Sequence, residues 1–368
     1  MEKKSGYILV FTMIMMAALS AIVVYIFNRG MTAIPLIAIA LEREKAKMVA
    51  FSGVEIARSL IVGPQNQQTK ETKKAGTQEA VAKKQDAQSN NQQEKQNPDQ
   101  QFLQHILPRL GRWSTYELKA SVDGVDGQLQ LCITCEDGKI NLNTIYDFNK
   151  HAFMGQNVQV GNWKTMLETL LKTVGATTKT ADLFPSLEAF LKKQQGPLED
   201  VTQLLLIPAF APFANILYVP CPKEQNKDIV PAIALTDLFT LYGNTAGLEP
   251  WLFSTSVQLA CGIKVNTTTF KQRTKDVMQW TKNFKPSPQW KTDWNITLKN
   301  MYEKELGALP KGLDSFFVGT FKPTFFGVLV QATVGRVTQK IYAIIERTRR
   351  SHNNQIVYDS IVRKWYIV

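Results

Sequence analysis

Residues 7–27 read YILVFTMIMMAALSAIVVYIF, a run of twenty-one residues without a charged side chain or a proline. With a rise of about 1.5 Å per residue, a helix of this length spans the roughly 30 Å hydrocarbon core of a bilayer. A short basic head, MEKKSG, precedes the run, and the FNR sequence at its end lacks the small-x-small pattern of a signal-peptidase site. The sequence therefore predicts a retained, single-pass membrane helix. Lys3 and Lys4 predict a cytoplasmic N-terminus, which places the bulk of the chain outside the cytosol.

The apolar run continues into an amphipathic segment, residues 42–61, with the sequence EREKAKMVAFSGVEIARSLI. Its apolar residues recur mostly at spacings of three and four, namely Ala46, Val49, Ala50, Gly53, Val54, Ile56, Ala57 and Leu60. This spacing places them along one side of a helix. We therefore expect one continuous helix over residues 7–62, with an apolar stripe available for packing.

The next segment, residues 63–101, has a different composition. From position 64 onward it contains eleven glutamines, six lysines, five acidic residues and no aromatic residue. Such a tract cannot bury enough apolar surface to offset the entropy lost on ordering. It is predicted to be a disordered linker or surface loop.

Composition and motifs argue against two classes of function. The chain has 368 residues and a net charge of +12, but its basic residues are spread thinly, so a nucleic-acid partner is disfavoured. The sequence has no HExxH, GxSxG or P-loop motif and no GxGxxG after a strand-like segment, and its three histidines lie in unrelated contexts. We therefore expect no enzymatic activity.

Residues 127–143, GQLQLCITCEDGKINLN, are typical of a hairpin. Asp137 and Gly138 would form the turn between two alternating runs. Asn141 and Asn143 would share one strand face, with side chains able to bond the backbone where the strand leaves the sheet. Their role is predicted to be structural.

The remaining sequence divides by periodicity. Short helices are expected at residues 163–174, 180–194, 198–206 and 235–242, and strands from residue 316 onward. We divide the chain into a leader (1–6), a spine helix (7–62), a linker (63–101), the first part of a sheet domain (102–145), an inserted α-helical domain (146–262), a connecting or partner-facing segment (263–312) and C-terminal antiparallel strands (313–368). The connecting segment is rich in tryptophan and lysine, and we expect it to be packed or to face a partner rather than to stack nucleic-acid bases.

Four cysteines are present. Cys132 and Cys135 form a CxxC, which can be a redox dithiol or half of a zinc site, but no second CxxC exists and a strand would send them to opposite faces. Packed thiols are therefore favoured. A disulfide between Cys221 and Cys261 is possible outside the cytoplasm, and the sequence leaves it open.

The head of the chain carries a resemblance to a known family. Lys3, Lys4, Ser5 and Gly6, followed directly by Tyr7 and a long apolar helix, resemble the class III signal of the type IV pilin superfamily. The resemblance implies that a prepilin peptidase cuts after Gly6 and that the new N-terminal residue, Tyr7, becomes N-methylated.

Two further features narrow the resemblance to the K-type minor pseudopilins of type II secretion. Most pilin-like proteins have a glutamate at the fifth mature position, where this chain has Phe11, and the K-type subunit characteristically lacks that carboxylate. In addition, the stretch EDGKINLNT, which contains Asp137, Gly138, Lys139, Asn141 and Asn143, is similar to a K-type signature at the start of the inserted helical domain.

This resemblance implies a pilin-like α+β fold, in which the N-terminal helix packs on a C-terminal antiparallel sheet. It implies a tip position in the pseudopilus, with I- and J-type minor pseudopilins, the major pseudopilin and the inner-membrane assembly platform as partners. The bulk of the chain would be periplasmic. No cofactor is expected; structural calcium is possible by resemblance, but its ligands are not identifiable. A tip subunit of a type IV or DNA-uptake pilus, and an unrelated membrane-anchored extracytoplasmic domain, remain alternatives.

Overall fold

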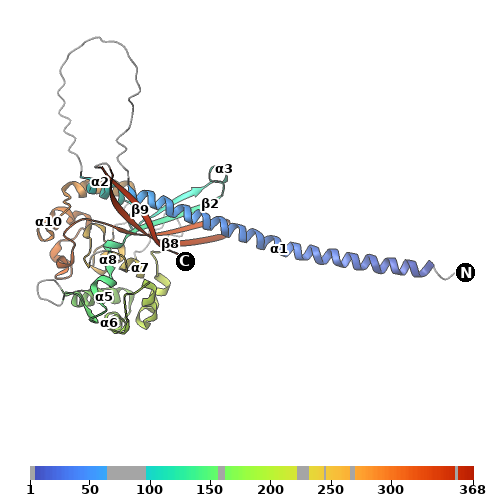
Figure 1. Ribbon diagram of the computed structural model, residues 1–368, viewed down its shortest axis with the longest axis horizontal. Helices are drawn as coiled ribbons and strands as arrows, with labels where there is room; N and C mark the ends of the chain where they lie inside the picture. The colour runs from blue at the N-terminus through green and yellow to red at the C-terminus, as the bar shows by residue number, and fades with distance from the viewer. Residues whose placement is uncertain are drawn as a thin grey trace, which may run out of the picture.

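The computed structural model describes residues 5–63, 97–155, 162–221, 232–243, 246–265, 270–352 and 355–368. The described chain has an α+β fold in which one long helix lies along a five-stranded antiparallel sheet, and shorter helices gather beyond it (Figure 1). The predicted architecture, a long N-terminal helix packed on an antiparallel sheet with an added helical region, is confirmed.

The long helix α1 (Ser5–Val62) is continuous over 58 residues. Its N-terminal part projects away from the rest of the molecule (Figure 1). Within it, Val10–Phe27 has a mean hydropathy of 2.4 and none of it is buried, so by length and composition this segment can cross a membrane. The C-terminal part of α1 is half-buried in the protein instead, through Ala46, Ala50, Gly53, Val54, Ala57 and Ile61.

The sheet has the strand order β1-β2-β7-β8-β9, with every neighbouring pair antiparallel. Its strands are β1 (Trp113–Leu118), β2 (Gly127–Cys135), β7 (Phe325–Val334), β8 (Val337–His352) and β9 (Gln355–Ile367). The last three form the meander predicted at the C-terminus. They begin at Phe325 rather than near residue 316, because residues 313–316 form a 3-10 turn.

Alternation along the strands decides which face meets α1. Leu129 and Leu131 of β2 pair with Ala332 and Val330 of β7, and all four are buried. Gly53 of α1 lies directly over this face, where an added Cβ would come within 2.6 Å of Val330. The small residues on the α1 stripe therefore let the helix backbone approach the sheet closely. Of the predicted stripe, Ile56 lies outside the contact and is 37% exposed.

Helices α4 to α11 form one region, residues 142–316, here called the helical part. It contains α4 (Leu142–Ile145), α5 (Trp163–Thr178), α6 (Leu183–Lys193), α7 (Leu235–Leu238), α8 (Thr255–Ala260), α9 (Phe270–Trp280), α10 (Trp290–Thr297) and α11 (Lys299–Tyr302). Seven 3-10 helices occur in the described chain, and the longer ones here are η2 (Val201–Leu206) and η3 (Pro208–Ile216). Two small sheets join it, β3 (Ile140–Asn141) with β6 (Phe239–Thr240), and β4 (Tyr146–Asp147) with β5 (Ala152–Phe153).

The predicted boundary of the helical domain at residue 262 is wrong. Trp294 is fully buried and stacks on Phe317 and Tyr302, and the Tyr302 ring in turn stacks on Phe253. Residues on both sides of position 262 therefore share one aromatic core, and the segment 263–312 is part of the helical part rather than a connection. Its tryptophans are packed, as one of the two predicted alternatives had it.

Two other expectations need correction. The segment 63–101 overlaps helix α2 (Pro98–Ile106), which is capped by the side chain of Asn97; residues 64–96 lie outside the described residues. The expected hairpin around Asp137 and Gly138 does not form. These residues make a 3-10 turn, η1 (Glu136–Gly138), after which β3 leaves the large sheet and pairs with β6 in parallel.

Candidate functional site

Gly6 and Tyr7, the residues of the predicted processing site, lie in the first turn of α1, which begins at Ser5. Lys3 and Lys4 lie outside the described residues. Phe11 follows one turn later and is 64% exposed. This end of α1 is far from the helical part (Figure 1).

The outer side of α1 and the edge strand β9 together expose apolar side chains. Met48 of α1 is 69% exposed, and Trp365 of β9 is 51% exposed. Phe51 joins the two elements through an edge-to-face contact with Trp365, with ring centroids 5.1 Å apart. We call Met48, Phe51 and Trp365 the α1–β9 face. It is an apolar surface of the kind that partner proteins cover.

The turn η1 joins the large sheet to the helical part through Asp137. The Asp137 carboxylate accepts the backbone N–H groups of Thr324 at 2.7 Å and of Phe325 at 3.2 Å, at the start of β7. Its backbone oxygen accepts the N–H of Glu249 at 2.8 Å. Burial raises the pKa of Asp137 to about 6, although the two N–H bonds act in the opposite direction. One residue thus fixes three segments that are distant in sequence.

Gly138 and Lys139 complete this junction. A Cβ on Gly138 would lie 1.8 Å from the backbone oxygen of Leu252, so only glycine fits there. The ammonium of Lys139 lies 2.5 Å from Glu136, and both side chains are 1% exposed. The Tyr342 hydroxyl also donates to Glu136 at 3.3 Å. The ion pair is therefore buried where the sheet meets the helical part.

The two asparagines of the motif bond the backbone, as predicted, but not from a common strand face. Asn141 caps α4 by accepting the N–H of Asn143 at 3.1 Å. Asn143, inside α4, donates from Nδ2 to the Leu198 oxygen at 2.9 Å and accepts the Leu198 N–H at 2.9 Å. These bonds hold the loop before η2 against the start of the helical part. The motif therefore acts as a structural joint.

The cysteines are packed rather than reactive. Cys132 and Cys135 are buried, and burial raises the pKa of both thiols. The possible disulfide between Cys221 and Cys261 is not formed. Cys221 donates its S–H to Gln130 Oε1 at 3.1 Å, and Cys261 is buried, which raises the pKa of its thiol to about 12.

No group of three or more histidine, cysteine, aspartate or glutamate side chains that could hold a metal occurs among the residues that the structure describes. Asp137 and Glu249 are two acidic residues near the joint between the sheet and the helical part. Both are buried, and burial raises the pKa of each carboxyl. Glu249 accepts the N–H of Trp251 at 3.3 Å and so caps the 3-10 helix η4 (Pro250–Leu252). Structural calcium remains a prediction.

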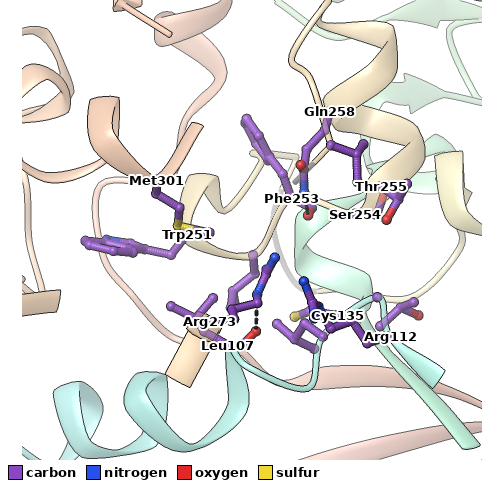
Figure 2. Close-up of a pocket in the computed structure, with 15 residues that line it drawn as sticks. Leu107, Arg112, Cys135, Trp251, Phe253, Ser254, Thr255, Gln258, Arg273 and Met301 are labelled. Carbon is purple, nitrogen blue, oxygen red and sulfur yellow. Dashed lines mark hydrogen bonds between the residues drawn. The ribbon is translucent and has the colours of Figure 1, made fainter. Parts of the chain in front are cut away.

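A cavity of about 40 Å³ lies between the segment after α2, the end of β2, and helices α8 and α9 (Figure 2). Arg112 and Arg273 both line it, and Arg273 Nε donates to the Leu107 oxygen at 3.2 Å. Burial and the charge of Arg273 lower the pKa of Arg112 to about 10. A space of this size holds only a few water molecules. The site is too small for an organic substrate.

One buried contact has no counterpart in the sequence motifs. The guanidinium of Arg347 on β8 lies 3.7 Å from the ring centroid of Phe102 and 3.6 Å from that of Tyr358. Burial lowers the pKa of Arg347 to about 10. The stacked rings of α2 and β9 thus clamp one end of the sheet. The alternation of apolar and polar residues predicted a strand around Arg347, but no pattern in the sequence predicted its contact with Phe102.

Comparison with known proteins adds little. No family model matches the chain. No curated protein is similar to it in sequence. A search of solved structures finds a chain described as "The Crystal Structure of the GspK-GspI-GspJ complex from enterotoxigenic Escherichia coli Type 2 Secretion System", with 9% identity and a TM-score of 0.35, covering 69% of this chain and 82% of that one. Because a TM-score of 0.35 does not establish a shared fold, the function proposed below rests on the chain's own motifs and contacts.

Proposed function

We propose that the protein is a non-enzymatic minor pseudopilin of the K type. It is anchored in the inner membrane, caps the tip of the periplasmic pseudopilus in type II protein secretion and helps to initiate its assembly. One observation carries this proposal: α1 is a single helix whose exposed apolar half can cross a membrane and whose other half packs along the antiparallel sheet. A processing signal at its start, Lys3 to Gly6, is what such an assembly helix requires.

The exposed part of α1 suits two environments in turn. Before assembly, Val10–Phe27 is solvated by lipid, which matches its hydropathy. In a fibre, the same surface packs against the apolar helices of neighbouring subunits. No contact of the folded body needs to break for this transfer, because none of this segment is buried.

The residue at the fifth mature position supports a place at the fibre tip. A carboxylate inside an apolar helix bundle costs several kcal/mol unless a positive group neutralises it. In pilin-like fibres that group is the amino terminus of the subunit ahead. Phe11 carries no charge and needs no such neighbour.

The position of the helical part supports the same place. Helices α5, α6 and α10 lie around the end of α1 that is opposite the N-terminus (Figure 1). With α1 anchored in a membrane, the helical part is therefore at the membrane-distal end. A subunit added beyond it along the fibre axis would meet this bulk. The arrangement suits a cap and not a repeating unit.

The α1–β9 face is the surface we assign to the I- and J-type minor pseudopilins. It runs along the part of α1 that is held by the sheet, so it is preorganised, which lowers the entropic cost of binding. Its aromatic centre, Phe51 and Trp365, is of the composition that anchors protein interfaces.

Mass spectrometry of the mature N-terminus tests the proposal. The full-length gene is expressed together with a prepilin peptidase, and the purified protein is digested and sequenced. The expected N-terminal peptide begins with N-methylated Tyr7. Gly6→Val should block cleavage, whereas the matched variant Ser5→Ala should be processed normally. An intact Met1, or a cut near Asn28, would overturn the proposal.

A further inference from the structure

A second cavity, of about 170 Å³, lies between the end of β9 and the helical part. Its walls include four tyrosines, Tyr218, Tyr242, Tyr342 and Tyr366, and two carboxylates, Glu136 and Asp200. No lysine or arginine is among the described residues that line it. We call this cavity the tyrosine pocket.

The rings are held in place by the sheet. Tyr342 of β8 and Tyr366 of β9 are cross-strand partners whose ring centroids lie 6.3 Å apart, nearly parallel. Tyr342 also contacts Tyr218, with ring centroids 5.2 Å apart. Three rings from two strands and the loop after η3 therefore form a connected aromatic wall with little freedom to rearrange.

The hydroxyl groups are held by the carboxylates. Tyr366 hydrogen-bonds the carboxylate of Asp200 and the hydroxyl of Tyr242. Tyr342 donates to Glu136 at 3.3 Å. Burial, aided by the charge of Asp200, raises the pKa of Tyr218 to about 12. The phenols stay neutral and the acids supply the charge.

The two carboxylates differ in whether a nearby positive charge neutralises them. Glu136 is paired with the buried ammonium of Lys139. Asp200 is the N-cap of η2 and accepts the N–H of Thr202 at 2.8 Å. All the hydrogen bonds that its carboxylate accepts within the described chain come from neutral donors. The pocket therefore has a net negative charge beside electron-rich ring faces.

One neighbouring cation shows what these rings attract. The ammonium of Lys364 lies 4.9 Å from the ring centroid of Tyr366 and also donates to the Glu199 backbone oxygen at 3.1 Å. Lys364 does not line the pocket. Aromatic faces bind alkylammonium and guanidinium groups in this manner, more strongly where water is excluded.

We propose that the tyrosine pocket binds an organic cation, an alkylammonium or guanidinium group. Such a group would lie against the rings of Tyr342 and Tyr366 and neutralise Asp200. The same chemistry has two sources: a small free ammonium compound, or the end of a lysine or arginine side chain on a partner polypeptide. The volume admits a head group of either kind, because it is about ten times the roughly 10–15 Å³ that a cavity needs to hold one water molecule.

Isothermal titration of the full-length protein in a maltoside detergent tests this assignment. The probe is tetramethylammonium, and tert-butanol is its neutral counterpart of similar shape. Acetyl-Gly-Lys-Gly-amide represents a partner's side chain, with the ε-acetylated peptide as its neutral control. Saturable binding of a charged probe, with no binding of the matched neutral one, is expected. Binding of tetramethylammonium alone identifies a free cation as the ligand, and binding of the lysine peptide identifies a side chain.

Variants locate the binding. Tyr366→Leu removes one ring and should weaken the affinity about tenfold, whereas Tyr366→Phe keeps the ring and should retain most of it. Asp200→Asn preserves an N-cap residue but removes the charge, and should also weaken binding about tenfold. Tyr116→Leu, on the opposite edge strand β1, is the control and should bind as the unmodified protein does. Circular dichroism melting confirms that each variant is folded.

Three results would overturn the assignment. The first is equal binding of tert-butanol and tetramethylammonium, which would show a merely apolar pocket. The second is unchanged binding by Asp200→Asn or by folded Tyr366→Leu. The third is the absence of saturable heat with every charged probe, measured at the highest protein concentration that solubility allows.

Discussion

The carboxylate of Asp137 accepts the backbone N–H of Thr324 at 2.7 Å, although the two residues are 187 positions apart. This bond ties the turn after β2 to the start of β7. The Asp137 backbone oxygen also holds Glu249. The joint between the sheet and the helical part thus depends on a carboxyl group that is buried.

The pH dependence of stability is the first prediction. The pKa of Asp137 is raised from 3.8 to about 6 by burial, so the folded state favours the neutral acid. The stabilising effect is therefore complete below about pH 4 and is lost as the pH rises through 6. A shift of about two units corresponds to about 3 kcal/mol. The raised pKa of Glu249 acts in the same direction.

Thermal melts of the full-length protein between pH 4 and 7 measure this effect. Asp137→Asn should flatten the profile, because it retains an oxygen for Thr324 and cannot ionise. Asp137→Ala should lower the free energy of unfolding by about 1–3 kcal/mol through unpaired N–H groups. A profile of Asp137→Asn that is as steep as that of the unmodified protein would assign the dependence to other groups.

Close helix packing gives the second prediction. A Cβ on Gly53 would lie 2.6 Å from Val330 and 2.8 Å from Leu129. Gly53→Val should therefore force α1 away from the sheet and cost about 1–3 kcal/mol, as overpacked cores do. Ser52→Val, one position along the same helix and exposed, is the matched control. Chemical denaturation curves compare the two, and similar stability would show that α1 can shift without loss.

The buried ion pair supplies the third prediction. Lys139→Met leaves Glu136 charged and unpaired in the interior, which should cost about 3–5 kcal/mol. The double variant Lys139→Met, Glu136→Gln removes both charges and should recover much of that loss. Lys299 and Glu305 form an exposed pair at 2.7 Å, and Lys299→Met should cost only about 0–1 kcal/mol. A double variant that is no more stable than Lys139→Met would show that the pair is not the cause.

Features set by local pattern could be predicted from the sequence. The length and hydropathy of α1 and the alternation of β7, β8 and β9 depend on neighbouring residues, and the elements appear where those patterns lie. The packed state of Cys132 and Cys135 could also be predicted, because a strand places residues three positions apart on opposite faces.

Features that depend on contacts between distant residues could not be predicted from the sequence. Asp137 and Gly138 have the residues of a hairpin turn, yet the next strand, β3, pairs with Phe239 and Thr240, about a hundred positions away. The residues of the turn do not indicate whether the strand that follows will pair with a neighbouring strand or with a distant one. Likewise, the sequence leaves open whether Trp294 is packed or faces a partner, and only its contacts with Phe317 and Tyr302 decide between the two.

The α1–β9 face gives the last prediction. Met48 is 69% exposed on this face, so a charge there should leave the fold intact. If I- and J-type pseudopilins bind this face, Met48→Glu places an unpaired carboxylate in a dry interface and should weaken their binding at least about tenfold. Met278→Glu is the matched control, because Met278 is 63% exposed on α9, in the helical part. Co-purification of the full-length protein with each partner from detergent-solubilised membranes, at equal expression, measures the loss. Equal recovery with both variants would place the partners on another surface of the molecule.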